Sequence, residues 1–142
     1  MLLVDKACWE QMRQHAETTF PEECCGAMLG RDRDDGDREV VWALPVDNVK
    51  DGPRERRFLI DPRALLEAER EARRTNLDVV GIYHSHPNHP SQASAFDRDH
   101  ALPYWSYLIV SCIDGRAGSV QSWRLRDDRS VFDEESIAVV PG

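Results

Sequence analysis

One apolar run constrains the fold of this chain more than any other feature. It is LDVVGIYH, residues 77–84, and apolar side chains follow one another in it without the alternation of a half-exposed strand. Such a run is typical of a strand that is buried on both faces in the centre of a sheet. A sheet of this kind needs helices to cover it, so we expect an α/β fold in which a mixed β-sheet is flanked by helices.

Two segments have the pattern of covering helices. A stripe of apolar residues at steps of three and four predicts an amphipathic helix over residues 6–18 that stops near Pro21. Asp61 and Pro62 give an N-cap and a first-turn proline, which predicts a second helix over residues 62–75. The stripe of the first helix consists of Trp9, Met12, Ala16 and Phe20.

The rest of the chain reads as short strands and one short helix. A charged loop over residues 31–39 predicts a hairpin turn, residues 47–57 form a long polar excursion, and residues 94–102 can form a helix that starts at a serine. No repeat or linker interrupts the pattern, so we expect a single domain over residues 1–142. The other expected strands are residues 2–4, 24–30, 39–46, 58–60, 107–112, 120–126 and 137–140.

The net charge and the length of the apolar runs restrict the partners and the location of the protein. The net charge is −8, from 26 acidic and 18 basic residues. This balance argues against nucleic acid or an anionic membrane surface as the main partner. No run of about 18 apolar residues is present, and the first residues turn polar too soon for a signal peptide, so we expect a cytoplasmic protein. The four cysteines lack CxxC spacing and are expected to be reduced and buried.

The segment directly after the apolar run carries the residue types of a metal site. His84 and His86 are two apart on a strand, so their side chains point to the same face. Asp97 follows eleven residues later, in the first turn of the expected helix. Two imidazoles and one carboxylate suit zinc and leave a fourth position open for water, which is the arrangement of catalytic rather than structural zinc.

A hydrolytic zinc site also needs a base and a donor to the oxyanion. Ser94 lies three residues before Asp97, so its hydroxyl projects beside the ligand on one helical turn. The segment PEECCG offers two acids, Glu22 and Glu23, directly before an apolar strand. The sequence therefore contains candidates for both parts.

These residues together resemble the JAMM (MPN-plus) zinc metalloproteases. The resemblance consists of a glutamate before an early strand, then HSHP, then Ser94 and Asp97 at the spacing of that family, and it extends over the whole chain. It implies an α-β-α fold like that of the cytidine deaminases and one zinc ion per chain. One departure is Ala93, where close relatives often have proline before the serine.

Carried over residue by residue, the resemblance implies a role for each position. His84, His86 and Asp97 would be the zinc ligands, and Ser94 would stabilise the oxyanion. Glu23 rather than Glu22 would be the general acid/base, because the family's glutamate stands three residues before the small residue that is here Gly26. The implied reaction is hydrolysis of a peptide or isopeptide bond without a covalent enzyme intermediate.

The short chain resembles the small bacterial members of the family, which act on β-grasp, ubiquitin-like sulfur-carrier proteins that end in GlyGly. The implied substrate is the C-terminal tail of such a carrier, lying past His86 and Ser94. One alternative is a non-catalytic scaffold or metal-binding interaction module, although such relatives usually lack a ligand or the glutamate. Another is a deaminase, but its HxE and PCxxC signatures are absent.

Other residues of the same types have simpler interpretations. His89 and His100 are expected at the surface or supporting the ligands, since catalytic zinc needs only three protein ligands. Cys24 and Cys25 lie in an apolar run and are expected to be buried rather than nucleophilic. Tyr104 and Trp105 either pack in the core or line a substrate groove.

Overall fold

The computed structural model describes residues 1–141. It contains three helices and eight strands within this range. The helices are α1 (Lys6–Thr19), α2 (Pro62–Arg74) and α3 (Ala95–Asp99). The strands are β1 (Leu2–Asp5), β2 (Cys25–Asp32), β3 (Arg38–Val46), β4 (Asp78–Pro87), β5 (Ser106–Ile113), β6 (Arg116–Leu125), β7 (Phe132–Glu135) and β8 (Ile137–Val140).

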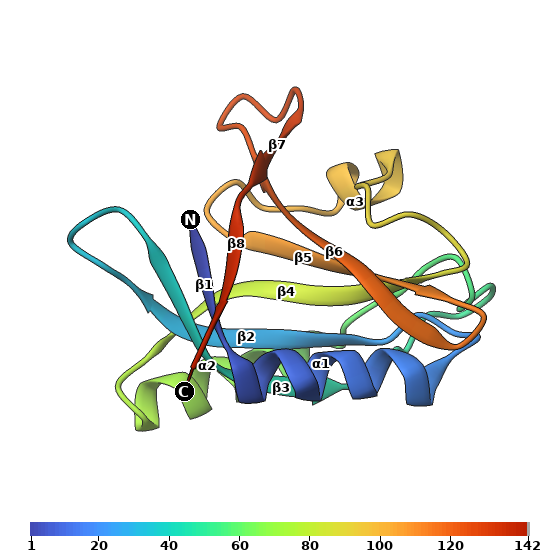
Figure 1. The fold of residues 1–142 in the computed structure, drawn as a ribbon, viewed down its shortest axis with the longest axis horizontal. Helices are drawn as coiled ribbons and strands as arrows, with labels where there is room; N and C mark the ends of the chain where they lie inside the picture. The colour runs from blue at the N-terminus through green and yellow to red at the C-terminus, as the bar shows by residue number, and fades with distance from the viewer. Residues whose placement is uncertain (142) are drawn as a thin grey trace.

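All eight strands form one mixed sheet, which confirms the expected fold class. Their order is β7-β6-β5-β4-β2-β3-β1-β8 (Figure 1). The β4–β5, β1–β3 and β1–β8 pairs are parallel, and the other pairs are antiparallel. The last strand runs parallel to the first, so the first and last strands lie side by side at one edge of the sheet (Figure 1).

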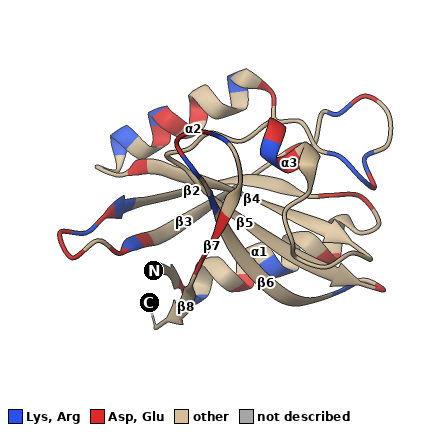
Figure 2. Ribbon diagram, turned by 90° about the horizontal axis from the view of Figure 1, so that it is seen from above, with Lys and Arg blue, Asp and Glu red and all other residues tan. Residues whose placement is uncertain are grey.

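Helices cover both faces of the sheet. Figure 2 shows α1 on one side of the strands and α2 on the other. Alternate residues of β4 meet these two layers: the hydroxyl of Tyr83 lies 2.9 Å from Nδ1 of His15 in α1, whereas Ile82 packs in a cluster with Leu65 of α2. His84 and His86 therefore project to the α2 side, on the same face as Ile82.

β4 occupies the centre of the sheet, as its apolar run predicts. Residues 80–87 are all buried. Its neighbour β2 approaches closely because Gly26 pairs with Tyr83, and a Cβ atom at position 26 would lie only 2.2 Å from the tyrosine ring. A residue without a side chain is thus required three positions after Glu23.

Most elements lie where the sequence predicts them, with three exceptions. Residues 58–60 were expected to form a strand but have no ladder partner, because β2 and β5 already occupy both edges of β4. The helix expected over residues 94–102 is shorter, since α3 ends at Asp99. β7 was not expected, because its sequence FDEE lacks apolar alternation.

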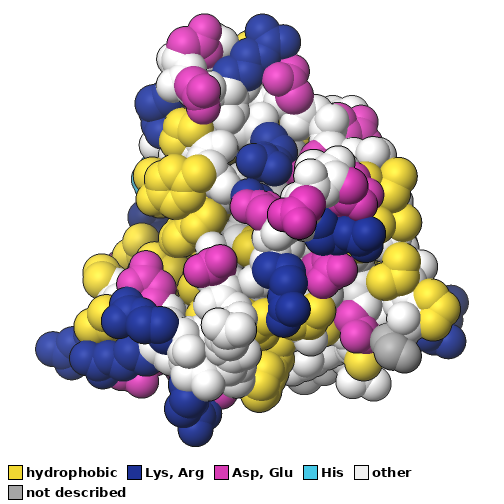
Figure 3. All heavy atoms as spheres, turned by 90° about the vertical axis from the view of Figure 1, so that its left-hand side faces the viewer, with side chains coloured by type: hydrophobic (Ala, Val, Ile, Leu, Met, Phe, Trp, Pro, Cys, Tyr) yellow, Lys and Arg dark blue, Asp and Glu magenta, His cyan; other side chains and the backbone are white. Residues whose placement is uncertain are grey.

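The described surface carries both signs of charge. On the face drawn in Figure 3, basic and acidic side chains are interspersed, with apolar side chains gathered between them. No helix among residues 1–141 is long and apolar enough to cross a membrane.

Candidate metal centre

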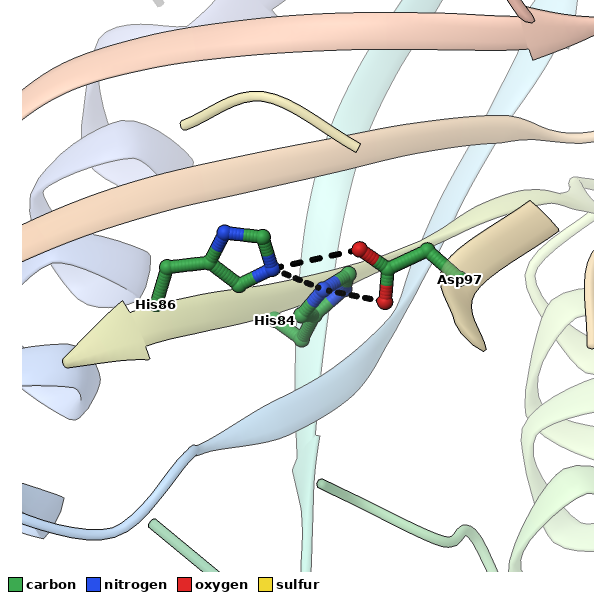
Figure 4. Close-up of side chains that lie close together, drawn as sticks. All are labelled: His84, His86 and Asp97. Carbon is green, nitrogen blue, oxygen red and sulfur yellow. Dashed lines mark hydrogen bonds and ion pairs between the residues drawn. The ribbon is translucent and has the colours of Figure 1, made fainter. Parts of the chain in front are cut away.

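Two histidines and one aspartate meet at the C-terminal end of β4 (Figure 4). Nε2 of His84 lies 3.2 Å from Nε2 of His86, and each of these nitrogens lies 3.2 Å from a different oxygen of Asp97. The strand supplies both imidazoles on one face, and α3 supplies the carboxylate. The structure thus brings together all three residues that the sequence singled out as ligands.

The separations between these atoms fit a tetrahedral ion. Zinc binds nitrogen and oxygen at about 2.0–2.1 Å, which places neighbouring tetrahedral ligands about 3.3 Å apart. The 3.2 Å between the two imidazole nitrogens agrees with this value, and each nitrogen has a different oxygen of Asp97 at the same distance. The donor set therefore fits a zinc ion in both chemistry and spacing.

A second contact orients the ring of His86. Its Nδ1 lies 2.8 Å from the carbonyl oxygen of Pro90, so Nδ1 carries the proton and donates it to this oxygen. Burial lowers the pKa of His86, but the hydrogen bond and charge of Asp97 outweigh it and raise the pKa, so the position between Nε2 and Asp97 favours a cation, either a proton or a metal ion. Metal-binding histidines usually make such a second contact, because it fixes the tautomer.

The electrostatics of the three residues favour a cation at their centre. Burial alone would raise the pKa of Asp97, but the imidazoles of His84 and His86 and the Ser94 N–H lower it well below its usual range. Burial lowers the pKa of His84 despite the opposing charge of Asp97. A permanently ionised carboxylate beside a neutral imidazole is the state that binds a metal ion.

Ser94 caps the helix that carries Asp97. The Asp97 N–H donates to Oγ of Ser94 at 3.1 Å, and the Ser94 N–H donates to Oδ2 of Asp97 at 2.9 Å. This reciprocal capping box fixes the carboxylate and the hydroxyl relative to each other. Because the Ser94 oxygen accepts in this arrangement, its O–H remains available to donate.

Glu23 lies near the candidate ligands His86 and Asp97, although it is some sixty residues before them in the sequence. Its side chain is buried, and Oε1 has no hydrogen-bond partner among the described residues. Burial raises the pKa of Glu23 to about 8, with His86 and Arg57 opposing the rise and Asp97 adding to it. A carboxyl group in this range can take up and release a proton near neutral pH.

A cleft of about 620 Å³ opens onto these groups. Glu23 and His86, which are buried, and Ser94, which is exposed, all line it. The remaining lining residues are Arg56, Arg57, His89, Pro90, Gln92 and Ala93. The candidate base, one ligand and the candidate oxyanion donor therefore face the same space.

A smaller apolar cavity of about 250 Å³ also borders the candidate ligands. His84 and Asp97 form part of its wall, together with Trp105. Trp105 is thus partly buried beside the site, whereas Tyr104 is 61% exposed and does not line this cavity. Its other lining residues are Phe58, Leu59, Ile60, Leu65, Ile82, Phe96, His100, Leu102 and Tyr107.

The remaining candidates take the simpler roles. His100 is exposed, and its Nδ1 bonds to the carbonyl oxygen of Phe96 at 2.9 Å rather than to Asp97. His89 is exposed at the rim of the cleft. Cys24 and Cys25 are buried, and burial raises the pKa of each thiol to about 12, so neither is an activated nucleophile.

Sequence reasoning missed several residues that hold this site. The ring of Phe58 stacks on His84 with 4.5 Å between ring centroids. Nε1 of Trp123 donates to the Ser91 carbonyl oxygen at 3.0 Å, and Oγ of Ser111 donates to the His89 carbonyl oxygen at 2.6 Å. These contacts fix the loop after His86. The apolar segment FLI is the one signal for Phe58 in the sequence, but it predicts a strand and not a contact with His84.

The fold and the site together define a class of proteins. It is the class of α/β domains in which an HxH motif at the end of a central strand and an aspartate on the next helix come together in a group that could hold a metal ion. The chain belongs to the prokaryotic homologs of the JAB domain, whose family model matches residues 5–126. The resemblance to JAMM proteins is confirmed at the level of the family.

Several curated proteins are similar to this chain. "Desampylase" of Haloferax volcanii is 38% identical over 128 residues, which cover 89% of this chain and 85% of the relative. "Probable TtuB-protein conjugate cleaving protease" of Thermus thermophilus is 36% identical over 117 residues, covering 82% of this chain and 74% of the relative.

Solved structures agree with the fold. A protein from Desulfitobacterium hafniense has a TM-score of 0.85 at 33% identity and covers 100% of this chain and 94% of its own. A protein from Salinibacter ruber has a TM-score of 0.74 at 38% identity, with 96% and 90% covered. A JAB1/MPN domain protein from Archaeoglobus fulgidus, 15% identical with a TM-score of 0.59, covers 99% and 97% and shares the fold.

Proposed function

We propose that this protein is a zinc-dependent peptidase that hydrolyses a peptide or isopeptide bond at the C-terminal tail of a small ubiquitin-like carrier protein. One observation carries the proposal. A buried carboxyl group, Glu23, faces the same cleft as the ligand His86 and the hydroxyl of Ser94. The chain therefore contains a metal site, a base and an oxyanion donor around one space.

Zinc is the ion that this donor set favours. Imidazole nitrogens and one carboxylate suit it, and three protein ligands leave one position open. A zinc ion bound there would polarise the substrate carbonyl and lower the pKa of a coordinated water to about 7. We assign the ion to Nε2 of His84, Nε2 of His86 and the carboxylate of Asp97.

The protein's own side chains perform the proton transfers. Glu23 takes the proton of the attacking water on its carboxylate and then gives it to the leaving nitrogen. Its burial keeps its pKa high enough for the second of these transfers. Ser94 donates its free O–H to the carbonyl oxygen as negative charge develops there. Water attacks directly, so no covalent enzyme intermediate forms.

The substrate class rests on the relatives. One is named as cleaving TtuB-protein conjugates, and two are named desampylases. An open cleft beside the ligands accepts an extended tail but not a folded domain. We infer that the tail of a GlyGly-ending carrier lies past His86 and Ser94, with the folded part of the carrier outside the cleft.

The test uses the zinc-loaded protein and a GlyGly-ending carrier fused through its C-terminus to a second protein. Wild type should release the carrier, and Glu23→Gln should lower kcat by about a hundredfold or more while it retains about one zinc per chain. The matched control is Glu22→Gln, because Glu22 is the alternative acid in the same segment. It should keep nearly full activity.

Two results would overturn the proposal. Full activity of Glu23→Gln would show that another group is the base. A wild-type protein that binds zinc but cleaves no carrier fusion would favour a metal-binding interaction module instead.

A further inference from the structure

The long segment between β3 and α2 lies against the candidate base. Glu23 precedes β2, so the sheet does not bind its backbone groups. Its N–H donates to the carbonyl oxygen of Arg54 at 2.8 Å, and its carbonyl oxygen accepts a bond from Nδ2 of Asn48 at 3.0 Å. Both backbone groups of Glu23 are therefore held by residues of this segment.

Asn48 uses the full hydrogen-bonding capacity of its side chain here. Nδ2 donates to the carbonyl oxygens of Glu23 and Arg57, both at 3.0 Å. Oδ1 accepts from the N–H groups of Lys50 and Leu59, both at 3.1 Å. Two carbonyls can only accept and two N–H groups can only donate, so only one orientation of the amide satisfies all four.

Two of the four partners of Asn48, Arg57 and Leu59, flank a residue that contacts the candidate ligand His84. Phe58 lies between Arg57 and Leu59, and its ring stacks on His84 at an interplanar angle of 28°. The guanidinium carbon of Arg57 also lies 4.5 Å from the ring centroid of Phe96, in the helix that carries Asp97. One amide thus connects the backbone of the base to the segment packed against the metal ligands.

We propose that Asn48 is a positioning residue: its side chain fixes where the carboxyl group of Glu23 stands relative to the ligands. The inference rests on the proposed role of Glu23 as the base. Asn48 lies outside the ligand set, so it acts through Glu23 and not on the metal ion. A base displaced by about 1 Å can lose on the order of a hundredfold in rate.

Asn48→Asp is the most direct variant, because it keeps the shape of the side chain and both acceptor contacts. It removes the two donors and places a carboxylate oxygen against the carbonyls of Glu23 and Arg57. We expect kcat to fall by about ten- to a hundredfold, with KM and zinc content within about twofold of wild type. Asn76→Asp is the matched control, since Asn76 is exposed and carries the same change of charge.

A second variant covers the case in which Asn48→Asp does not fold. Asn48→Gln keeps the amide on a longer stem, so it retains the donors but cannot meet all four partners at once. We expect a smaller loss of kcat than in Asn48→Asp, again with unchanged zinc content. A fall in melting temperature with unchanged kcat per bound zinc would assign Asn48 a merely structural role and overturn the proposal.

Amide hydrogen exchange of the metal-free protein gives a readout that is independent of activity. In Asn48→Asp the Glu23 amide should exchange faster, because its acceptor Arg54 moves away, while the β2 amides after Met28 should not change. Unchanged exchange at Glu23 would overturn the proposal even if the wild-type protein showed no peptidase activity. Failure of the proposed function and failure of this inference are thereby distinguished.

Discussion

Two buried polar clusters lie at opposite ends of β4, and they differ in how completely they are satisfied. The metal-end cluster consists of Glu23, His84, His86 and Asp97. The far-end cluster, at the start of β4 and β5, consists of Arg38, Ser106, Ser122 and Glu135. Among the described residues, the only buried side-chain nitrogen and oxygen atoms without a partner are Oε1 of Glu23 and Nδ1 of His84, both at the metal end.

The far-end cluster is a closed network. Nη1 of Arg38 donates to the Val80 carbonyl oxygen at 3.0 Å and to Oγ of Ser106 at 3.1 Å. Ser106 and Ser122 both donate to Glu135. A satisfied network of this kind stabilises a fold, whereas unpartnered buried atoms mark a place where something else binds or reacts. The comparison separates structural from chemical polar residues within one sheet.

The largest expected effect is at the metal end. His84→Ala should abolish stoichiometric zinc binding and lower peptidase activity by more than about a hundredfold, since even outer partners of a metal site cost about 10–100-fold. Zinc content per chain and cleavage of the carrier fusion measure this. His100→Ala is the control, because His100 bonds to Phe96 and not to Asp97. Retained zinc in His84→Ala would contradict the assigned ligands.

Ser94 lies beside the metal-end cluster and Ser106 belongs to the far-end cluster, so the two serines allow a matched pair of variants. Ser94→Ala should lower kcat by about ten- to a thousandfold, because a donor to the oxyanion is lost. Ser106→Ala should leave kcat unchanged and lower only stability. Kinetics and melting curves of the two variants decide the point. Equal effects on kcat would mean that the two ends of the sheet are not functionally distinct.

The far-end cluster should matter for stability alone. Arg38→Ala removes a buried donor to the Val80 carbonyl oxygen and to Ser106, so we expect the free energy of unfolding to fall by about 2–3 kcal/mol. Zinc content and kcat of the folded fraction should not change. Urea denaturation measures the loss, with Arg33→Ala as the exposed control. A wild-type stability for Arg38→Ala would show that the network contributes nothing.

The smallest expected effect is the contribution of Asp32 to the pH dependence of stability. The hydrogen bond and charge of Arg38 hold the pKa of Asp32 below its ordinary value of 3.8. The folded state then binds fewer protons than the unfolded state, so Asp32 contributes stability above pH 3.8 that is lost as the pH falls below this value. The stability difference between wild type and Asp32→Asn should shrink as acid is added. A difference that grows on acidification would contradict the ion pair.

The comparison also shows what a sequence of this kind can predict. The central strand, both long helices and the three candidate ligands follow from local patterns, because the 14 residues from His84 to Asp97 contain all three candidates. The role of Asn48 and the place of Phe58 depend on contacts between distant segments, so no local pattern indicates them. The segment 58–60 has the composition of a strand but packs on the site, because tertiary contacts decided its structure.

The loop after His86 gives the same lesson. The side chains of Trp123 and Ser111, from two later strands, donate hydrogen bonds to it. The sequence pattern at these two positions indicates only that they lie in strands. Only the family resemblance indicates Glu23 in the sequence, and in the structure Glu23 lines the same cleft as His86. A candidate base from a distant part of the chain cannot be inferred from spacing alone.

Zinc anomalous diffraction from crystals of the metal-loaded protein shows directly where the ion binds. We expect one strong peak per chain, between Nε2 of His84, Nε2 of His86 and the carboxylate of Asp97, and no such peak in His84→Ala. A wild-type crystal with no peak at this position, or with its one strong peak elsewhere, would show that these three residues are not the ligands.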